Sequence, residues 1–216
     1  MDTAVALVEA YLQINGYLCV AEYPLLETDP AGEVRMVSDL DVLAFRFPHA
    51  GHEVAGRGDR ELAGDTRFEP DPVLGADPAQ PDMIVGEVKR GRARFNPATR
   101  RPEVLAAALM RFGCCTPTEA LALAQRLVRH GHAQSHHGHA IRMIAFGSSD
   151  PEDTPSSWRV VPLSAIVRGL REHLSGQWTR LKQVQFGNPS LDLLALLERI
   201  EPVDGVRQGT SSEVTR

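Results

Sequence analysis

Apolar positions recur at helical spacing in several stretches of this chain. Over residues 3–14, Val5, Val8 and Leu12 fall on one stripe, and Gly16 is a typical stop signal. Similar patterns and start signals predict further helices over residues 102–112, 117–130, a segment capped by Ser164, and 190–200. The pattern therefore distributes helices along the whole chain rather than at one end.

The second and third of these predicted helices follow one another across a short turn. Thr116 and Glu119 form a capping box with a proline at the first helical position, which marks where the later helix begins. Such a pair can be a helix-turn-helix. Its many alanines and leucines are more typical of helices that cover a sheet, and we interpret the adjacent Cys114 and Cys115 as packing residues.

Strand patterns lie between the helices. The sequence predicts strands over Tyr17–Leu26, Val37–Phe47, the Met83–Lys89 region, Ile141–Phe146 and Trp158–Leu163. The run Met83-Ile84-Val85 is apolar on consecutive positions, as in a strand that is covered on both faces.

Alternation assigns faces within the Val37–Phe47 strand. We expect Leu40, Val42 and Ala44 on one face. The other face then carries Asp39, Asp41, Leu43 and Phe45.

The order of elements predicts one α/β domain with a mixed sheet over residues 1–200. Residues 48–80 are rich in Gly, Pro and Asp without a sustained period, so we predict a long loop or insertion there. For residues 201–216 we predict a disordered tail.

Composition and charge narrow the function classes. The net charge of −5 means that any nucleic acid would be held by a local patch rather than by a global basic field. Three cysteines form neither a disulfide framework nor a zinc motif, the opening residues lack a basic signal-peptide region, and no apolar run is long enough to span a membrane. We expect a soluble, cytoplasmic protein with no membrane partner.

Charged residues at the end of the apolar strand carry the candidate chemistry. Glu87 and Lys89 are two residues apart, so they project from the same face of their strand. If the strand that bears Asp41 is a neighbour, two carboxylates converge beside one ammonium. This set suits a hard divalent cation such as Mg²⁺ or Mn²⁺, with the lysine placed to orient a water or to neutralise charge.

The stretches SDLDVLA and MIVGEVKRGRARFNP resemble the motifs of the PD-(D/E)xK nuclease superfamily, including its small Holliday-junction-resolvase-like and uncharacterised members. The resemblance implies a restriction-endonuclease-like three-layer domain, with a central mixed β-sheet flanked by helices. It matches Asp41 to the strand aspartate and Glu87 and Lys89 to the E-x-K pair. It also implies the Val88 backbone carbonyl as a metal ligand and Glu9 as the helix glutamate of several relatives.

Arginines extend the same strand. Arg90, Arg92 and Arg94 alternate beyond Lys89, and Arg100 and Arg101 follow. A strand end of this kind can be a solvated surface, but its place beside the proposed metal favours contacts with phosphates.

Other polar residues receive structural interpretations. We interpret Asp39 as a hydrogen-bonding or supporting group and Asp82 as a turn residue. The five histidines from His130 to His139 match no closed zinc site, so we interpret them as a solvated connector.

The sequence therefore predicts a metal-dependent nuclease that hydrolyses the phosphodiester bonds of DNA, with RNA as another substrate and a homodimer as a further alternative. A catalytically inactive nucleic-acid-binding or protein-interaction module on the same fold is the competing hypothesis. A metal titration separates the two, because an inactive module need not bind a cation at Asp41 and Glu87.

Overall fold

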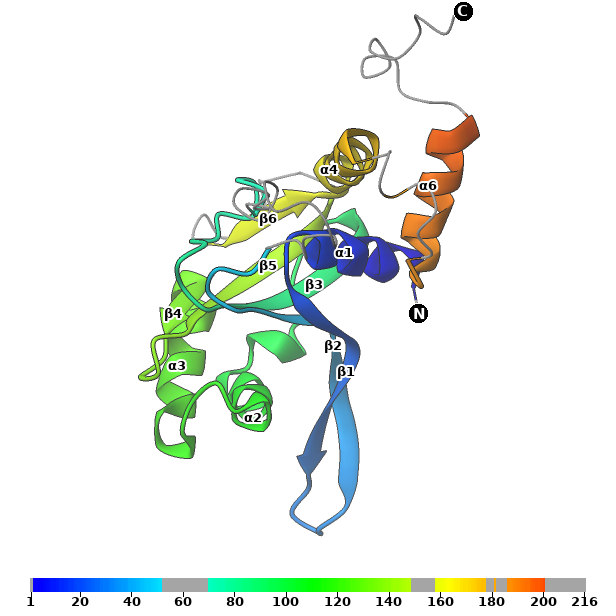
Figure 1. The fold of residues 1–216 in the computed structure, drawn as a ribbon. Coiled ribbons are helices and arrows are strands. Elements are labelled where there is room, and N and C mark those ends of the chain that lie inside the picture. Colours follow the sequence, from blue (N-terminus) through cyan, green and yellow to red (C-terminus); the bar gives the residue numbers. More distant parts are fainter. Residues whose placement is uncertain (1, 52–69, 149–157, 178–180, 182–185, 201–216) are drawn as a thin grey trace, which may run out of the picture.

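Helices cover both faces of a six-stranded mixed sheet (Figure 1). The computed structural model describes residues 2–51, 70–148, 158–177, 181 and 186–200. The helices are α1 Thr3–Ile14, α2 Pro102–Phe112, α3 Pro117–His130, α4 Leu163–Gly176 and α6 Pro189–Ile200, with the 3-10 helix η2 at Ala98–Arg100. The strands are β1 Leu18–Thr28, β2 Val34–Arg46, β3 Asp82–Arg92, β4 His132–Gln134, β5 Ala140–Ser148 and β6 Arg159–Pro162.

The sheet has the order β1-β2-β3-β5-β4, and β6 also pairs with β5. β1 pairs antiparallel with β2, and β2 pairs antiparallel with β3. β3 pairs parallel with β5. On its other edge, β5 pairs antiparallel with β4 and parallel with β6. β3 is central, and its residues Asp82–Val88 are all buried. This burial on consecutive positions confirms the prediction of a strand that is covered on both faces.

Two hydrophobic clusters fill the space between the sheet and its helices. One cluster packs α1, α4 and α6 against side chains such as Val42, Ile84 and Phe146. The other packs α2 and α3 against side chains such as Leu43, Met83 and Met143. The α/β class, the mixed sheet and the layered arrangement agree with the sequence prediction.

The α2–α3 pair covers the sheet, as its alanine and leucine content predicts. The buried face of α3 consists of Ala120, Leu123, Ala124 and Leu127, all in the second cluster. The capping box of Thr116 and Glu119 is present. Cys114 and Cys115 are buried in the same cluster, which confirms them as packing residues.

Several predicted details are wrong. Ser164 does not cap α4, because the helix begins one residue earlier at Leu163, after Pro162. The histidine-rich connector contains the short edge strand β4, held by its pairing with β5. Residues 52–69 of the predicted insertion and the predicted tail 201–216 lie outside the described residues.

Leu40 is another correction, because it does not share a face with Val42 and Ala44. It packs instead with Leu43, in the α2–α3 cluster. In β1, Glu22 lies between the paired residues Ala21 and Tyr23 and has a φ of 52°. β1 changes face across this residue, since Ala21 packs against the α1 cluster and Tyr23 against the α2–α3 cluster.

Asp82 is a buried ion-pair partner rather than a turn residue. It is the first residue of β3, and its carboxylate accepts hydrogen bonds from Arg142 Nε (2.7 Å) and Arg142 Nη2 (2.6 Å). The Tyr17 hydroxyl donates to the same carboxylate at 2.5 Å, and Arg142 Nη1 donates to the Leu74 carbonyl. Burial, followed by the Asp82 charge, raises the pKa of the Tyr17 hydroxyl. This network joins β1, β3, β5 and the segment before β3.

The segment before β3 is held by a second buried arginine. Arg46 is 1% exposed, and its guanidinium donates to the carbonyl oxygens of Asn15, Pro78 and Ala50. Tyr11 of α1 also donates to Asp71 at 2.7 Å.

In the part of the chain that the structure describes, every helix is too short or too polar to cross a bilayer.

Substitution of Asp82 by Asn should destabilise the protein strongly. The variant leaves the Arg142 guanidinium partly buried without its counter-charge, which costs about 3 kcal/mol or more of unfolding free energy. Urea denaturation measures the loss. The matched control is Arg90→Ala, which breaks an exposed pair with Asp2 and should cost about 1 kcal/mol or less. Equal losses in both variants would contradict a structural role for the Asp82 network.

Candidate functional site

Strand pairing brings Asp41 and Glu87 to the same place. β2 and β3 run antiparallel, and the last pair at this end of their ladder is Val42 opposite Gly86. Asp41 and Glu87 are the residues that directly follow this pair on the two strands. Because Gly86 and Val88 face the α1 side, Glu87 projects from the face that α2 and α3 cover.

Lys89 connects the two carboxylates. Its Nζ lies 2.7 Å from Glu87 Oε1 and 3.3 Å from Asp41 Oδ2. Asp41 Oδ2 also accepts a hydrogen bond of 2.6 Å from the Val88 backbone N–H. The structure thus brings all three motif residues, Asp41, Glu87 and Lys89, into direct contact.

Burial changes the proton affinity of this group. Glu87 is 2% exposed, and burial raises its pKa from the ordinary value of 4.5 to about 6, although the hydrogen bond and charge of Lys89 oppose this rise. The nearby charges of Asp41 and Asp39 raise it further. Burial lowers the pKa of Lys89, but the hydrogen bond and charge of Glu87 outweigh it and leave that pKa raised. The ammonium therefore stays charged beside two carboxyl groups at neutral pH.

One carboxylate oxygen of Glu87, Oε2, has no hydrogen-bond donor among the described residues. The atom is buried. An unpaired buried carboxylate oxygen costs free energy, so its presence calls for a further partner. A cation that ligates Glu87 and Asp41 would be such a partner, and hard oxygen ligands suit Mg²⁺ or Mn²⁺.

The candidate cation site contains only two carboxylates. In the described ranges, no cluster of three or more His, Cys, Asp or Glu side chains could hold a metal ion. Mg²⁺ commonly uses one or two carboxylates and completes its shell with water and phosphate oxygens. The donor set therefore fits a cation that shares its coordination with a substrate. It does not fit a closed structural site.

The other predicted ligands have separate positions. The Val88 backbone N–H is used by Asp41, and the role of the Val88 carbonyl stays a prediction. Glu9 lies on α1 near Cys19, where burial raises the pKa of Glu9. No hydrogen bond or ion pair between described residues joins Glu9 to Asp41, Glu87 or Lys89, so its role also stays a prediction.

The predicted arginines differ in their surroundings. Arg90 is 72% exposed on its side chain and forms an ion pair of 2.8 Å with Asp2, the N-cap residue of α1. Arg92 and Arg94 are also exposed. The Arg100 guanidinium lies over the ring of Trp158, 5.0 Å from its centroid. The first three arginines therefore present charge beside Lys89, whereas Arg100 also packs against an aromatic ring.

One link near the site has no counterpart in the sequence prediction. Asn96, in the segment after β3, donates to Ser38 Oγ of β2 at 3.2 Å. Its own side-chain oxygen accepts from the Ala98 backbone N–H at 3.1 Å. This asparagine holds the arginine-bearing segment 92–101 against β2. Its local signal is the Asn-Pro pair, which indicates a turn but not the partner of the asparagine.

Comparisons with protein-family models, with curated proteins and with solved structures returned no match for this chain.

The raised pKa of Glu87 predicts a pH-dependent stability. An acid whose pKa is higher in the folded protein than in the unfolded chain favours folding only while it is protonated. Its contribution is complete below about pH 4.5 and is lost as the pH rises through about 6. The lost contribution is on the order of 2 kcal/mol, since one pKa unit corresponds to about 1.4 kcal/mol.

Denaturation of the parent protein and of Glu87→Gln across this pH range measures the effect. The unfolding free energy of the parent, relative to the variant, should fall as the pH rises. Glu103→Gln, on the exposed surface of α2, controls for the removal of one carboxylate. A constant difference between parent and Glu87→Gln would show that Glu87 titrates at its ordinary value.

Proposed function

We propose that this protein is a metal-dependent nuclease that hydrolyses phosphodiester bonds of DNA. One observation carries the proposal. Asp41 and Glu87 meet on neighbouring central strands and share the Lys89 ammonium, and no described residue donates a hydrogen bond to the buried Glu87 Oε2. Burial of a carboxylate oxygen without a hydrogen-bond donor is costly, and a bound cation would offset that cost.

The arrangement of the strands supports membership of the PD-(D/E)xK superfamily and its restriction-endonuclease-like fold. In this proposal the E-x-K pair lies on the central strand β3, and the aspartate lies on its antiparallel neighbour β2. Helices α1 and α2, from opposite layers, enclose these strands. The sequence resemblance and the positions of the three side chains are independent supports for the same assignment.

The proposed chemistry divides between a cation and the protein. When bound by Asp41 and Glu87, Mg²⁺ or Mn²⁺ would stabilise the charge that develops at the phosphodiester and lower the pKa of an attacking water. The protein holds both carboxylates on rigid strands, so little reorganisation is needed. The Val88 N–H orients Asp41, and it leaves Asp41 Oδ1 for a ligand.

Lys89 has a separate task. In the structure its ammonium forms ion pairs with both carboxylates and offsets one of their two negative charges. When a cation takes over that neutralisation, the half-buried ammonium becomes available to orient a water or to neutralise the transition state. A catalytically inactive module remains the competing function, because the ion pairs of Lys89 with Asp41 and Glu87 can also be permanent structural contacts.

Variants of Asp41 and Lys89 distinguish these roles. Asp41→Ala removes an anionic ligand, so it should lose both metal binding and cleavage. Lys89→Ala removes a cation that cannot ligate a metal, so it should retain or tighten metal binding while cleavage falls by about 10²-fold or more. Calorimetry with Mg²⁺ and Mn²⁺, and gel assays on plasmid, linear and branched DNA, measure the two properties on the same preparations.

Asp39→Ala is the matched control for Asp41, since Asp39 is an exposed carboxylate on the same strand. It should keep both properties. If the parent binds no cation, the inactive module is the better interpretation. If Lys89→Ala cleaves DNA as fast as the parent does, the assigned role of the lysine is wrong.

The arginines should act through phosphates. Replacing Arg90, Arg92 and Arg94 together by Ala should weaken DNA binding for all sequences alike. It should also flatten the dependence of affinity on salt, by about 0.9 in logarithmic slope for each phosphate that the variant no longer neutralises. Arg126→Ala and Arg129→Ala, on α3, provide the control. Fluorescence anisotropy over a salt series gives both quantities, and an unchanged slope in the triple variant would assign these arginines to a solvated surface.

A further inference from the structure

The hairpin of β1 and β2 projects beyond the rest of the sheet and forms an arm (Figure 1). We define the arm as residues 22–40. Of the β2 residues, Val42–Arg46 pair with β3, whereas the outer part of β2 pairs with β1. Tyr23 anchors the arm on α2 through an edge contact with Phe112, with ring centroids 5.7 Å apart.

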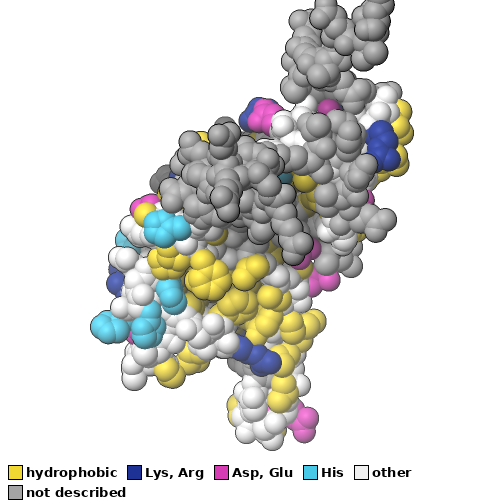
Figure 2. All heavy atoms as spheres, in the orientation of Figure 1, with side chains coloured by type: hydrophobic (Ala, Val, Ile, Leu, Met, Phe, Trp, Pro, Cys, Tyr) yellow, Lys and Arg dark blue, Asp and Glu magenta, His cyan; other side chains and the backbone are white. Residues whose placement is uncertain are grey.

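An open groove of about 350 Å³ runs between the arm and α2. Its lining is Tyr23, Pro24, Leu25, Leu26, Ala107, Ala108, Met110 and Arg111. Arg111 is the only charged residue of this lining, and its guanidinium lies 6.0 Å from the Tyr23 ring centroid. Leu26, Met36 and Met110 expose 49%, 67% and 42% of their surface beside the groove. Figure 2 shows hydrophobic side chains from the centre of this face down to the arm, with a basic side chain beside them.

The chemistry of the groove selects its occupant. A nucleic acid would need several cations to neutralise its phosphates, and this lining has one. An added β-strand would need a regular free edge, but β1 carries Pro24, which has no N–H, and shifts register between Leu25 and Leu26. The groove lining is apolar apart from one cation, Arg111. A helix that inserts apolar side chains and places an acidic group near Arg111 matches both of these properties.

The same chain exposes a helix of this kind. Leu193, Leu196, Leu197 and Ile200 of α6 are all exposed large hydrophobic residues, and their spacing of i, i+3, i+4 and i+7 places them on one stripe. Asp192, exposed, lies four residues before Leu196 and so on the same side. The opposite side of α6 packs on its own molecule through Leu191.

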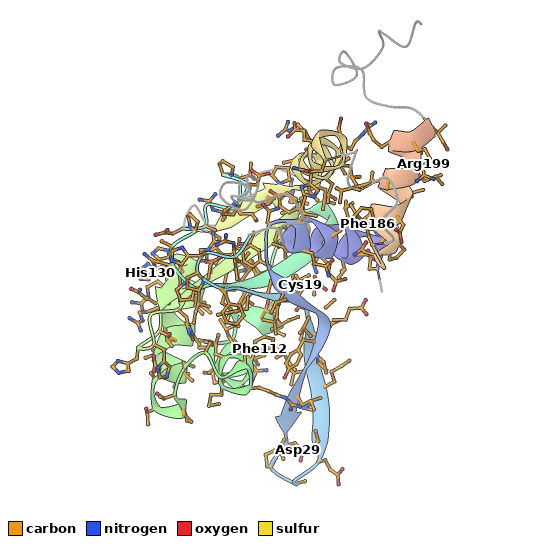
Figure 3. All side chains as sticks on the ribbon, in the orientation of Figure 1. Cys19, Asp29, Phe112, His130, Phe186 and Arg199 are labelled. Atoms are coloured by element: carbon orange, nitrogen blue, oxygen red, sulfur yellow. The ribbon has the colours of Figure 1, made fainter. Side chains whose placement is uncertain are left out.

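In one molecule these two surfaces are far apart. α6 lies against α1 and α4. Figure 3 shows Asp29 at the end of the arm and Phe112 on α2, away from Arg199 on α6. The helix therefore cannot reach the groove of its own copy without leaving its layer.

We propose that the groove binds the α6 stripe of a second copy of this chain, with Asp192 of one protomer beside Arg111 of the other. Two observations support this occupant: both surfaces are apolar, with the α6 residues at helix spacing, and Arg111 and Asp192 carry opposite charges at their edges. A two-fold axis would use the contact twice, which closes the dimer and doubles the buried area toward that of a stable interface. This inference does not depend on catalysis.

Sedimentation velocity of the full chain over a concentration series tests the proposal. The parent should form dimers. Met110→Glu in the groove, and the pair Leu196→Glu and Leu197→Glu on α6, should each lower the association constant at least about tenfold, or about 1.4 kcal/mol. Leu121→Glu, at an exposed leucine of α3 outside the groove, is the matched control and should dimerise as the parent does.

Mixing the groove variant with the α6 variant gives a sharper test. Each variant keeps the surface that the other lacks, so the mixture should associate through one intact contact although neither variant does so alone. Arg111→Glu should also weaken the dimer, and addition of Asp192→Arg in the same chain should restore it. Circular dichroism and thermal melting establish that the variants fold.

Three results would overturn the proposal. A monomeric parent at all concentrations would exclude a second copy and assign the groove to a helix of another protein. Unchanged association in both the groove and α6 variants would place the dimer contact elsewhere. Failure of the mixed variants to associate, with both folded, would show that the two surfaces do not meet.

Discussion

The antiparallel pairing of β2 with β3 is the contact on which the rest of the structure depends. It places the most buried strand beside the hairpin, and it divides the apolar side chains between two helical layers. Gly86 permits the close approach, since a Cβ there would lie 3.0 Å from the Phe146 ring and 3.4 Å from Val42 Cβ. Asp41 and Glu87 directly follow the Val42–Gly86 pair at the end of this ladder. The pairing that assembles the sheet therefore also brings the two candidate carboxylates near each other.

The electrostatic balance at this place is unusual for a protein interior. Two carboxyl groups and one ammonium share a largely enclosed volume, and the net charge of the ionised group is negative. Two other buried charges have different partners: Asp82 pairs with the one cation Arg142, and Arg46 donates to carbonyl oxygens such as that of Pro78. The surplus negative charge distinguishes the candidate site from the structural networks, and a cation would neutralise it.

Sequence patterns predicted that Asp41, Glu87 and Lys89 lie together, but they did not predict the buried Asp82–Arg142 network. Asp41, Glu87 and Lys89 interrupt apolar strands, and strand periodicity alone brings such residues to one face. Arg142, the partner of Asp82, is 60 residues away in the sequence, and no local sequence pattern predicts this pair. Leu40 changes face together with Tyr23, its partner in β1, next to the left-handed residue Glu22. Burial periodicity is local, whereas ion pairing and face reversal depend on tertiary neighbours, and this explains the different outcomes.

The parallel pairing of β3 with β5 has a consequence for how the protein folds. Parallel partners need a crossover, and here α2 and α3 provide it, so the paired residues Glu87 and Ala145 are 58 positions apart. Pairing at such separations raises the relative contact order and slows folding, because the chain loses loop-closure entropy before the strands form their hydrogen bonds. During synthesis β3 leaves the ribosome before β5 exists. The strand that carries Glu87 and Lys89 must therefore wait, with one edge uncovered, until the crossover helices have been made.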